Sequence, residues 1–314
     1  MSNRNKNQIA VIGHLVRDRI VGFSGNKVEA LGGIAYSLAA LTVAAGKQCG
    51  IIPVCSIGYD LVPVVRQVFG QFPAIDLSHI RQIDRKNKIH ELIYKSGNYR
   101  EELNYGELPK ITPSLFNGPG RIDAALVSYI GGDEFQPRNI RWLKGHFMPL
   151  IYLDYHSLAL GRTVLDKKRR IAKRYFRHNP HWREYVCEAD IVQMNFLELK
   201  SIFPETENEV DSIITSVKAI KSTGPGIVII TREEKDLIVI AGLKRKPDIY
   251  ILPVRPIAKV VDPTGCGDSF AAGFLSSYID YKDVLKACET GLDLAGRKAG
   301  FSGLDGFLWP ANEE

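Results

Sequence analysis

Continuous apolar runs recur along this chain, and helical patterns lie between several of them. The run at 227–230 (Ile-Val-Ile-Ile) is the clearest example. Such runs suit strands that are covered on both faces, and strands that alternate with helices imply a mostly parallel sheet. The chain is therefore expected to be an α/β protein with a mostly parallel central sheet and helices on both of its faces.

The pattern also places the expected elements and an exception to them. Strands are predicted at 8–12, 49–55, 124–128, 150–154, 190–194, 226–231 and 237–241. Helices are predicted at 35–45, 138–144, 166–177 and 209–222. The segments 15–31 and 88–106 are polar, extended and rich in charged and Tyr residues, and part of the second alternates as a sheet wet on one face does. Without an internal repeat or a low-complexity linker, residues 1–314 are expected to form one domain.

Composition limits the class of protein. Of the 314 residues, 45% are hydrophobic, and no apolar stretch is long enough to span a bilayer. The first eight residues are polar and lack the apolar core of a secretory signal. Five cysteines form no CxxC pair, and their odd number favours a reduced compartment. A cytoplasmic protein without a membrane partner is expected.

A basic cluster stands out against the modest net charge of +6. Lys167–Arg170 begins it, and Lys173, Arg174 and Arg177 continue it among aromatic residues. Basic residues interleaved with aromatics can bind nucleic acid, whereas a helix with a solvated basic face has the same composition. The second interpretation is preferred because the rest of the chain carries no nucleic-acid motif, so no nucleic-acid partner is expected.

The stretch 261–274 carries the strongest chemical signal, since Gly265 and Gly267 stand just before a helical pattern. Glycines there let the backbone turn sharply and direct N–H groups at an anion, which the positive end of the helix dipole also favours. Asp268 follows in the first helical turn, either as a capping residue or as a general base beside a phosphoryl group. Cys266 is either a thiolate favoured by the helix end or a small residue that fits the turn.

This stretch resembles the signature of the ribokinase-like sugar kinases, the PfkB family, which reads Asp-Thr-x-Gly-Ala-Gly-Asp before an apolar helix. The matching residues are Asp262, Thr264, Gly265, Gly267 and Asp268, while Cys266 replaces the usual Ala. The resemblance implies the ribokinase-like fold with a small β lid, formed near 15–31 and 88–106. It also implies a homodimer that pairs through the lid.

Further residues are assigned through this resemblance. Gly32 and Gly33, which precede a helix, correspond to the glycine pair that the family places against its sugar. Asp18 corresponds to an Asp that accepts hydrogen bonds from sugar hydroxyls, and a carboxylate suits that role. Ser37 stands where the family has an Asn, which indicates an altered substrate, and Tyr36 beside it is unusually large.

On the nucleotide side, Asn195 and Glu198 resemble an Asn-x-x-Glu motif that organises Mg²⁺ through water. The same pair also has the spacing of a capping box. Thr231 matches the first residue of a Thr-x-Gly-x-x-Gly loop, but Glu233 and Asp236 replace both glycines. The resemblance therefore leaves the phosphate donor open.

The combined prediction is an ATP-dependent phosphotransferase that acts on a hydroxyl of a small sugar or sugar-like substrate. Asp268 is the expected base, and the N–H groups of Gly265, Cys266 and Gly267 are expected to stabilise charge on the phosphoryl group. Thr231 and Thr264 are expected on the cofactor side, with ATP and Mg²⁺ as cofactors. A monovalent cation, known in the family, stays open. The alternatives are a nucleoside kinase of the same fold and a non-catalytic ligand-binding relative.

Overall fold

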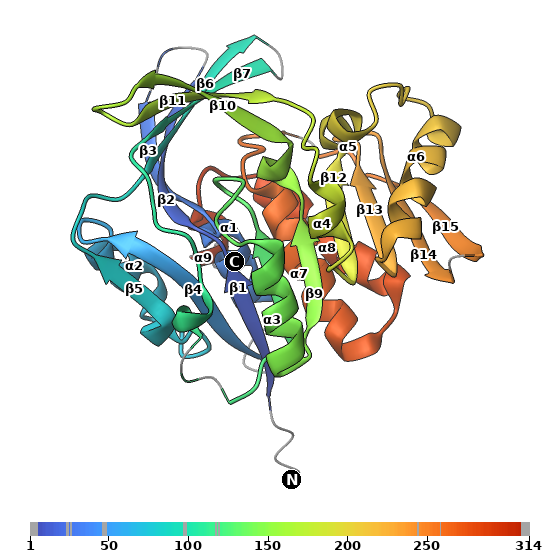
Figure 1. Cartoon of the computed structure of the whole chain (residues 1–314), viewed down its shortest axis with the longest axis horizontal. Helices are drawn as coiled ribbons and strands as arrows, with labels where there is room; N and C mark the ends of the chain where they lie inside the picture. Colours follow the sequence, from blue (N-terminus) through green and yellow to red (C-terminus); the bar gives the residue numbers. More distant parts are fainter. Residues whose placement is uncertain are drawn as a thin grey trace.

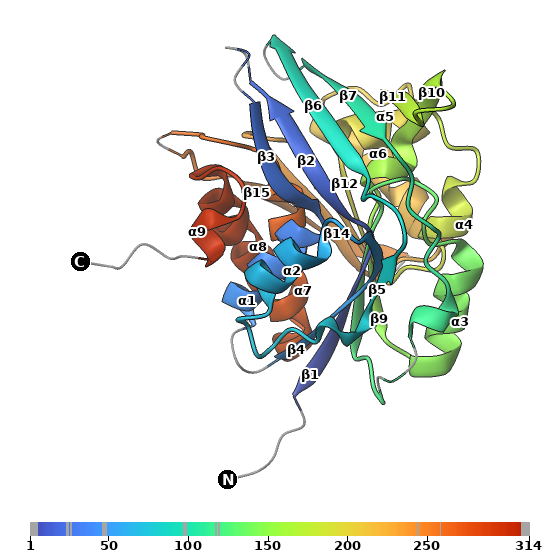
Figure 2. The same cartoon turned by 90° about the vertical axis from the view of Figure 1, so that its left-hand side faces the viewer.

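A computed structural model describes residues 6–22, 25, 27–45, 49–96, 99–116, 118, 120–243, 245–257 and 259–308. Residues 23, 24 and 26 of the first expected lid segment, and 97 and 98 of the second, lie outside this described part. The described elements form two sheets, a large sheet with helices on both faces and a smaller one that rises from one edge of it (Figures 1 and 2).

The large sheet has the order β15-β14-β13-β12-β9-β8-β1-β4-β5 within the described residues. Its strands are β1 (Asn7–Ile12), β4 (Cys49–Gly58), β5 (Ile80–Ile83), β8 (Ala124–Ser128), β9 (Leu150–Asp154), β12 (Ile191–Asn195), β13 (Ile227–Thr231), β14 (Asp236–Leu243) and β15 (Lys246–Pro253). Pairing is parallel from β5 to β13, and the pairs β13–β14 and β14–β15 are antiparallel. The predicted α/β class and mostly parallel sheet are confirmed.

Helices cover both faces of this sheet, as its buried strands require. One layer holds α1 (Ala35–Ala44), α2 (Val62–Phe69), α7 (Cys266–Tyr281), α8 (Val284–Ala299) and α9 (Asp305–Leu308), and the other holds α3 (Pro137–Phe147), α4 (Trp182–Val186), α5 (Phe196–Ile202) and α6 (Val210–Thr223) (Figure 2). Alternate residues of the strands point into two separate apolar clusters. Ile9 and Val11 pack with α1 and α7, whereas Ala10 and Ile12 pack toward α3. No described helix is long and apolar enough to cross a bilayer.

The smaller sheet is the lid, and it is larger than the sequence indicated. Its order is β10-β11-β7-β6-β2-β3, with β2 (Leu15–Val21), β3 (Lys27–Gly33), β6 (Ile89–Ser96), β7 (Tyr99–Tyr105), β10 (Leu160–Asp166) and β11 (Ile171–Phe176). Short 3₁₀ turns lie at Leu77–His79, Pro113–Leu115 and His156–Ala159. The two expected lid segments thus supply four strands, and a third segment adds the hairpin β10–β11.

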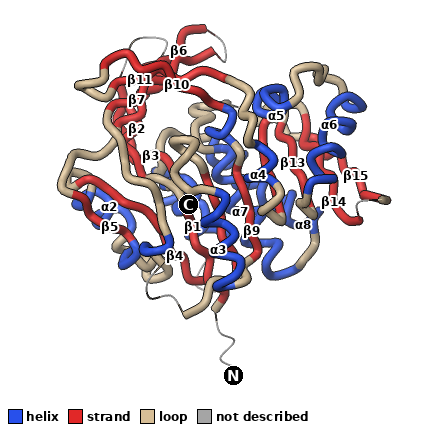
Figure 3. The backbone as a smooth tube through the Cα atoms, in the orientation of Figure 1, coloured by secondary structure: helices blue, strands red, loops and turns tan. Residues whose placement is uncertain are grey.

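The helix predicted over 166–177 is therefore wrong, because these residues form the turn and second strand of that hairpin (Figure 3). Arg170 has a positive φ of 53° in the turn, and β11 pairs antiparallel with both β10 and β7. The basic residues Lys167–Arg170 lie at the exposed tip of the hairpin rather than on a helix face. Arg174, by contrast, is buried on the inner face of the sheet.

Candidate active site

The turn before α7 is shaped by close packing. Gly265 is the N-cap of α7 with φ 86°, and a Cβ there would lie 2.3 Å from the Tyr36 ring. The Asp262 carboxylate holds the preceding residue, since its Oδ1 accepts from the Thr264 N–H at 2.9 Å. Only Gly combines this conformation with this contact. The large Tyr36 side chain thus packs against the turn and limits it to glycine at position 265.

The N–H groups of this turn differ in their availability. Cys266 donates to the Pro263 carbonyl at 3.2 Å, whereas the N–H groups of Gly265 and Gly267 meet no protein acceptor within the described part of the chain. At a helix N-terminus such unpaired donors form an anion site. Burial raises the pKa of the Cys266 thiol to about 11, so Cys266 acts as a small residue in the turn rather than as a thiolate.

Asp268 faces this turn from the first turn of α7. Its Oδ1 accepts from the Ser37 hydroxyl at 3.4 Å, so Ser37, expected at the substrate, contacts the candidate base itself. Burial raises the pKa of Asp268 to about 6, while His156 and the Ser37 hydrogen bond oppose that rise. A carboxyl with a pKa near neutrality is suited to accept a proton from an attacking hydroxyl.

Asp18 and the glycine pair Gly32–Gly33 form one packed unit at the base of the lid. A Cβ on Gly32 would lie 2.0 Å from the Asp18 carboxylate, and one on Gly33, which has φ 65°, would lie 2.1 Å from the His14 carbonyl. The glycines therefore make room for the neighbouring strand β2 and for Asp18. Asp18 is 2% exposed, and its Oδ1 has no hydrogen-bond partner among the described residues. A buried carboxylate oxygen in this state is ready to accept a ligand donor.

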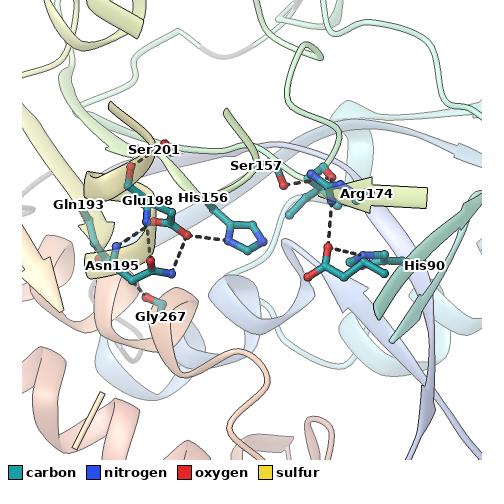
Figure 4. Close-up of polar contacts among 11 residues, drawn as sticks. His90, His156, Ser157, Arg174, Gln193, Asn195, Glu198, Ser201 and Gly267 are labelled. Carbon is teal, nitrogen blue, oxygen red and sulfur yellow. Dashed lines mark hydrogen bonds and ion pairs between the residues drawn. The ribbon is translucent and has the colours of Figure 1, made fainter. Parts of the chain in front are cut away.

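A row of polar side chains continues from Asp18 across the inner face of the lid. His90 lies 3.6 Å from Asp18 and 3.3 Å from Glu102, and Arg174 lies 3.7 Å from Glu102. Arg174 also donates to the Ile130 carbonyl at 2.9 Å, which connects the lid to the loop after β8 (Figure 4). Sequence reasoning missed this row, although the alternation of residues along two lid strands was the signal that could have shown it.

Asn195 and Glu198 form the capping box that their spacing indicated. Glu198 N donates to Asn195 Oδ1 at 2.9 Å, and Asn195 N donates to Glu198 Oε2 at 2.8 Å. His156 Nδ1 lies 3.1 Å from Glu198 Oε1, as Figure 4 shows. Burial alone would lower the pKa of His156, but the bond to Glu198 and the charge of Asp154 raise it to about 9. His156 is thus a cation in this site at neutral pH.

Two other residues of the site were not singled out from sequence. Gln193 donates to the Gly267 carbonyl at 3.1 Å and accepts from the Tyr152 hydroxyl, so it holds the α7 turn against β12. Asp154 is 8% exposed, and burial together with the charge of Asp268 raises its pKa well above the ordinary value. Both lie in apolar runs, which sequence patterns assign to the core.

In the β13–β14 connection, which was expected on the nucleotide side, charged side chains pair with one another. Arg232 forms a bidentate ion pair with Asp236 and also donates to the Asn208 carbonyl at 3.2 Å. The charge of Asp236 is therefore neutralised within the β13–β14 connection, while the exposed Glu233 has φ 53°. Thr231 ends β13 beside Asn195, and Thr264 Oγ1 lies 3.2 Å from the hydroxyl of Tyr94 in the lid.

The described residues contain no group of three His, Cys, Asp or Glu side chains placed to hold a metal. Glu198 fits Mg²⁺ through water, because its carboxylate already accepts from Asn195 N, Asn195 Nδ2 and His156 and keeps lone pairs for a water molecule.

Comparison with known proteins finds a family model that matches part of the chain. The model of the pfkB family carbohydrate kinases matches residues 174–305, which include the α7 turn and the Asn195–Glu198 pair. In these residues the chain resembles the pfkB family. This match, together with the fold and the kinases that the chain is similar to, supports a ribokinase-like kinase of the carbohydrate and nucleoside class.

Individual relatives agree with this. The cytidine kinase of Thermococcus kodakarensis is 26% identical over 91% of this chain and 94% of its own length. Among solved structures, a pyrophosphate-dependent kinase in the ribokinase family has a TM-score of 0.73 at 19% identity, covering 94% of this chain and 96% of its own. Arabidopsis thaliana ribokinase has a TM-score of 0.71 at 14% identity, covering 98% and 100%. The ribokinase-like fold expected from the sequence is thereby confirmed.

Proposed function

We propose that this chain transfers the terminal phosphoryl group of ATP to a hydroxyl of a nucleoside. The observation that carries the proposal is the position of Asp268, a carboxylate with raised pKa in the first turn of α7 beside the unpaired N–H groups of Gly265 and Gly267. Asp268 accepts the hydroxyl proton, and Ser37 orients its carboxylate. The two glycine N–H groups bind the charge of the phosphoryl oxygens.

On the acceptor side, Asp18 accepts hydrogen bonds from ribose hydroxyls through Oδ1, which has no hydrogen bond among the described residues and lies 3.6 Å from His90 Nδ1. Gly32 and Gly33 place that carboxylate over strand β3. A sugar that is held by two hydroxyls presents the third to Asp268 in a fixed orientation, which is the main requirement for phosphoryl transfer.

On the donor side, Thr231 and Thr264 contact the phosphates, and MgATP supplies the phosphoryl group. Glu198 and Asn195 would hold Mg²⁺ through water, and the cationic His156 beside Glu198 would offset part of the negative charge there. The Arg232–Asp236 pair supports this use of the loop, because it removes the charge of Asp236 from the donor side.

A nucleoside is favoured over a free sugar as the acceptor. The similarity to a cytidine kinase over nearly the whole length supports this choice. So does the lid, where His90, Glu102 and Asn104 are each buried on a face shared with Asp18, and Asn104 Oδ1 has no hydrogen-bond partner among the described residues. An amide can pair with the adjacent donor and acceptor on the edge of a nucleobase, an edge that a free pentose lacks.

The test is phosphoryl transfer from MgATP, and from pyrophosphate as a second donor, to cytidine, uridine, adenosine, ribose, fructose and myo-inositol. We expect turnover with at least one nucleoside and a loss of ~10²–10⁴ in kcat for Asp268→Asn, since a positioned base contributes about that factor. Asp293→Asn, an exposed carboxylate on α8, is the matched control and should keep full activity.

Near-normal turnover of Asp268→Asn would remove Asp268 from the role of base. Turnover with ribose, fructose or myo-inositol but with none of the nucleosides would move the acceptor to the free sugars. Transfer from pyrophosphate but not from ATP would replace the donor.

A further inference from the structure

Lys298 is a charged residue that is fully buried in the protein. It lies near the end of α8 with 0% of its surface exposed, although lysine is almost never fully buried without a partner. Its Nζ donates to the Asp262 carbonyl at 3.1 Å and to the Phe301 carbonyl at 3.0 Å, and it lies 3.5 Å from Asp262 Oδ2. Three oxygens therefore surround one buried ammonium group.

The ammonium lies directly behind the anion-binding turn. Asp262, which contributes two of the three oxygens, also fixes the Thr264 N–H through Oδ1 and receives the Gly303 N–H at Oδ2. Nζ lies 5.7 Å from the centroid of the Tyr36 ring, and the same ring packs against Gly265. The charge is thus separated from the phosphate-binding N–H groups only by the residues that shape the turn.

Carbonyl and carboxylate oxygens that converge on one point are the ligands that a monovalent cation takes when it loses its water. The monovalent cation that the sequence left open does not fit here, because Nζ already stands where the oxygens meet. Burial lowers the pKa of Lys298, while the charge of Asp262 opposes that effect and favours the ammonium form.

We infer that the Lys298 ammonium is a built-in substitute for a dissociable monovalent cation. It supplies the fixed positive charge that holds Asp262 and the Thr264–Gly267 turn in the phosphate-binding conformation. The protein therefore needs no K⁺ either for the stability of this turn or for phosphoryl transfer. Lys298 is a positioning residue, since it acts through Asp262 and touches no reacting atom.

The first test uses melting temperature and requires no substrate. Wild type, Lys298→Ala and Lys298→Met are compared in KCl, NH₄Cl and choline chloride at equal ionic strength. We expect wild type to melt at the same temperature in all three salts. Both variants should melt roughly 5–10 °C lower in choline, because Asp262 loses its buried partner.

The two variants separate a specific site from a general salt effect. Lys298→Ala leaves space among the oxygens, so K⁺ or NH₄⁺ should restore part of its melting temperature, whereas choline is too large to enter. Lys298→Met fills the same space with an apolar chain and should gain nothing from either ion. A wild type stabilised by K⁺ over choline, or equal gains by both variants, would overturn the inference.

The second test is phosphoryl transfer in the same salts, and this readout alone rests on the proposed function. Wild type should keep its rate when choline replaces K⁺. Lys298→Ala should lose roughly tenfold or more in choline and recover in part with K⁺ or NH₄⁺. A wild-type kinase that requires K⁺ would refute the role of Lys298 and leave the proposed function intact. Failure to find a substrate would leave the melting experiment to decide.

If Lys298→Ala does not yield folded protein after expression and purification in KCl, the measurements on wild type in the three salts test the inference. Indifference of its melting temperature and rate to K⁺ supports the inference, and dependence on K⁺ contradicts it.

Discussion

At the scale of single residues, the candidate site contains buried charged groups that shift one another's pKa values. Asp268 and Asp154 both have pKa values raised by burial, and His156 is a cation beside them. Sites that run acid–base chemistry show such opposed shifts. Asp268 is the carboxyl among these with a pKa near 6 and with the anion-binding turn as its neighbour, which explains its suitability as the base.

This arrangement predicts a pH profile. Asp268 accepts a proton only when ionised, so kcat/KM should rise with pH and level off above an apparent pKa of about 6. His156→Gln removes a positive charge that favours the ionised form of Asp268. The rise of kcat/KM with pH should therefore move to higher pH. The measurement is kcat/KM from pH 5 to 9 for both proteins. An unchanged apparent pKa of this rise in the variant would show that His156 does not act on Asp268.

At the scale of elements, α5 begins in the site because its capping residues are also site residues. Asn195 closes β12 and caps α5, and Glu198 completes the box from the first turn. Stability and chemistry therefore share the same side chains here. Helix α8, in the layer on the other face of the large sheet, has a simple cap at Asp283, which accepts from Lys286 N at 3.1 Å and lies outside the site.

These two caps allow a matched comparison. Asn195→Ala and Asp283→Ala should each lower the melting temperature by about 2–4 °C, the effect of losing ~1 kcal/mol of capping energy. Only Asn195→Ala should also raise the Mg²⁺ concentration required for half-maximal activity, because it releases Glu198. Equal Mg²⁺ requirements for the two variants would assign Asn195 a structural role only.

The elements also show what sequence patterns resolve. The continuous apolar runs predicted the inner strands, and the Gly265–Asp268 string predicted a helix N-terminus with its acid in the first turn; both are present in the structure. Strand β11, within the predicted helix over 166–177, has Ile171 and Tyr175 four residues apart, a spacing that also suits a helical face. Its true partner, β7, lies some 70 residues away, as Lys173 and Glu101 illustrate with a separation of 72.

The missed site residues have a similar cause. Gln193 and Asp154 are polar residues inside apolar runs, and Lys298 lies in a helix whose other basic residue in the last turn, Arg297, is exposed at the surface. Their roles depend on contacts such as Gln193 with Gly267, which only the folded chain brings together. Composition and spacing contain no signal for such contacts.

At the scale of the whole molecule, the lid and the large sheet meet through few buried polar contacts. Arg174 crosses from β11 to the Ile130 carbonyl, where the Ser157 hydroxyl also donates at 3.3 Å. Tyr94 joins the lid to Thr264 on the opposite side. The lid thus touches both halves of the candidate site, and we expect its position to control whether water reaches the reacting groups.

Removal of one of these contacts should loosen the lid. For Arg174→Ala we expect KM for the acceptor to rise about tenfold, since a buried charged hydrogen bond is lost. Amide hydrogen exchange in β6 and β7 should also become faster. Arg162→Ala, which removes an exposed ion pair with Glu107 on the same hairpin, is the control and should change neither quantity. Unaltered exchange in Arg174→Ala would mean that the lid does not depend on this contact.

The pairing of α1 with α7 has a consequence for synthesis on the ribosome. Ser37 and Asp268 meet across a sequence separation of 231, and the buried surface of α1 from Ala35 to Leu41 packs against a helix that ends at Tyr281. The lid strands are complete once residue 176 has emerged, but the apolar face of α1 stays uncovered until nearly the whole chain has been translated. During that interval the nascent chain carries an exposed apolar helix, which is the kind of surface that chaperones bind.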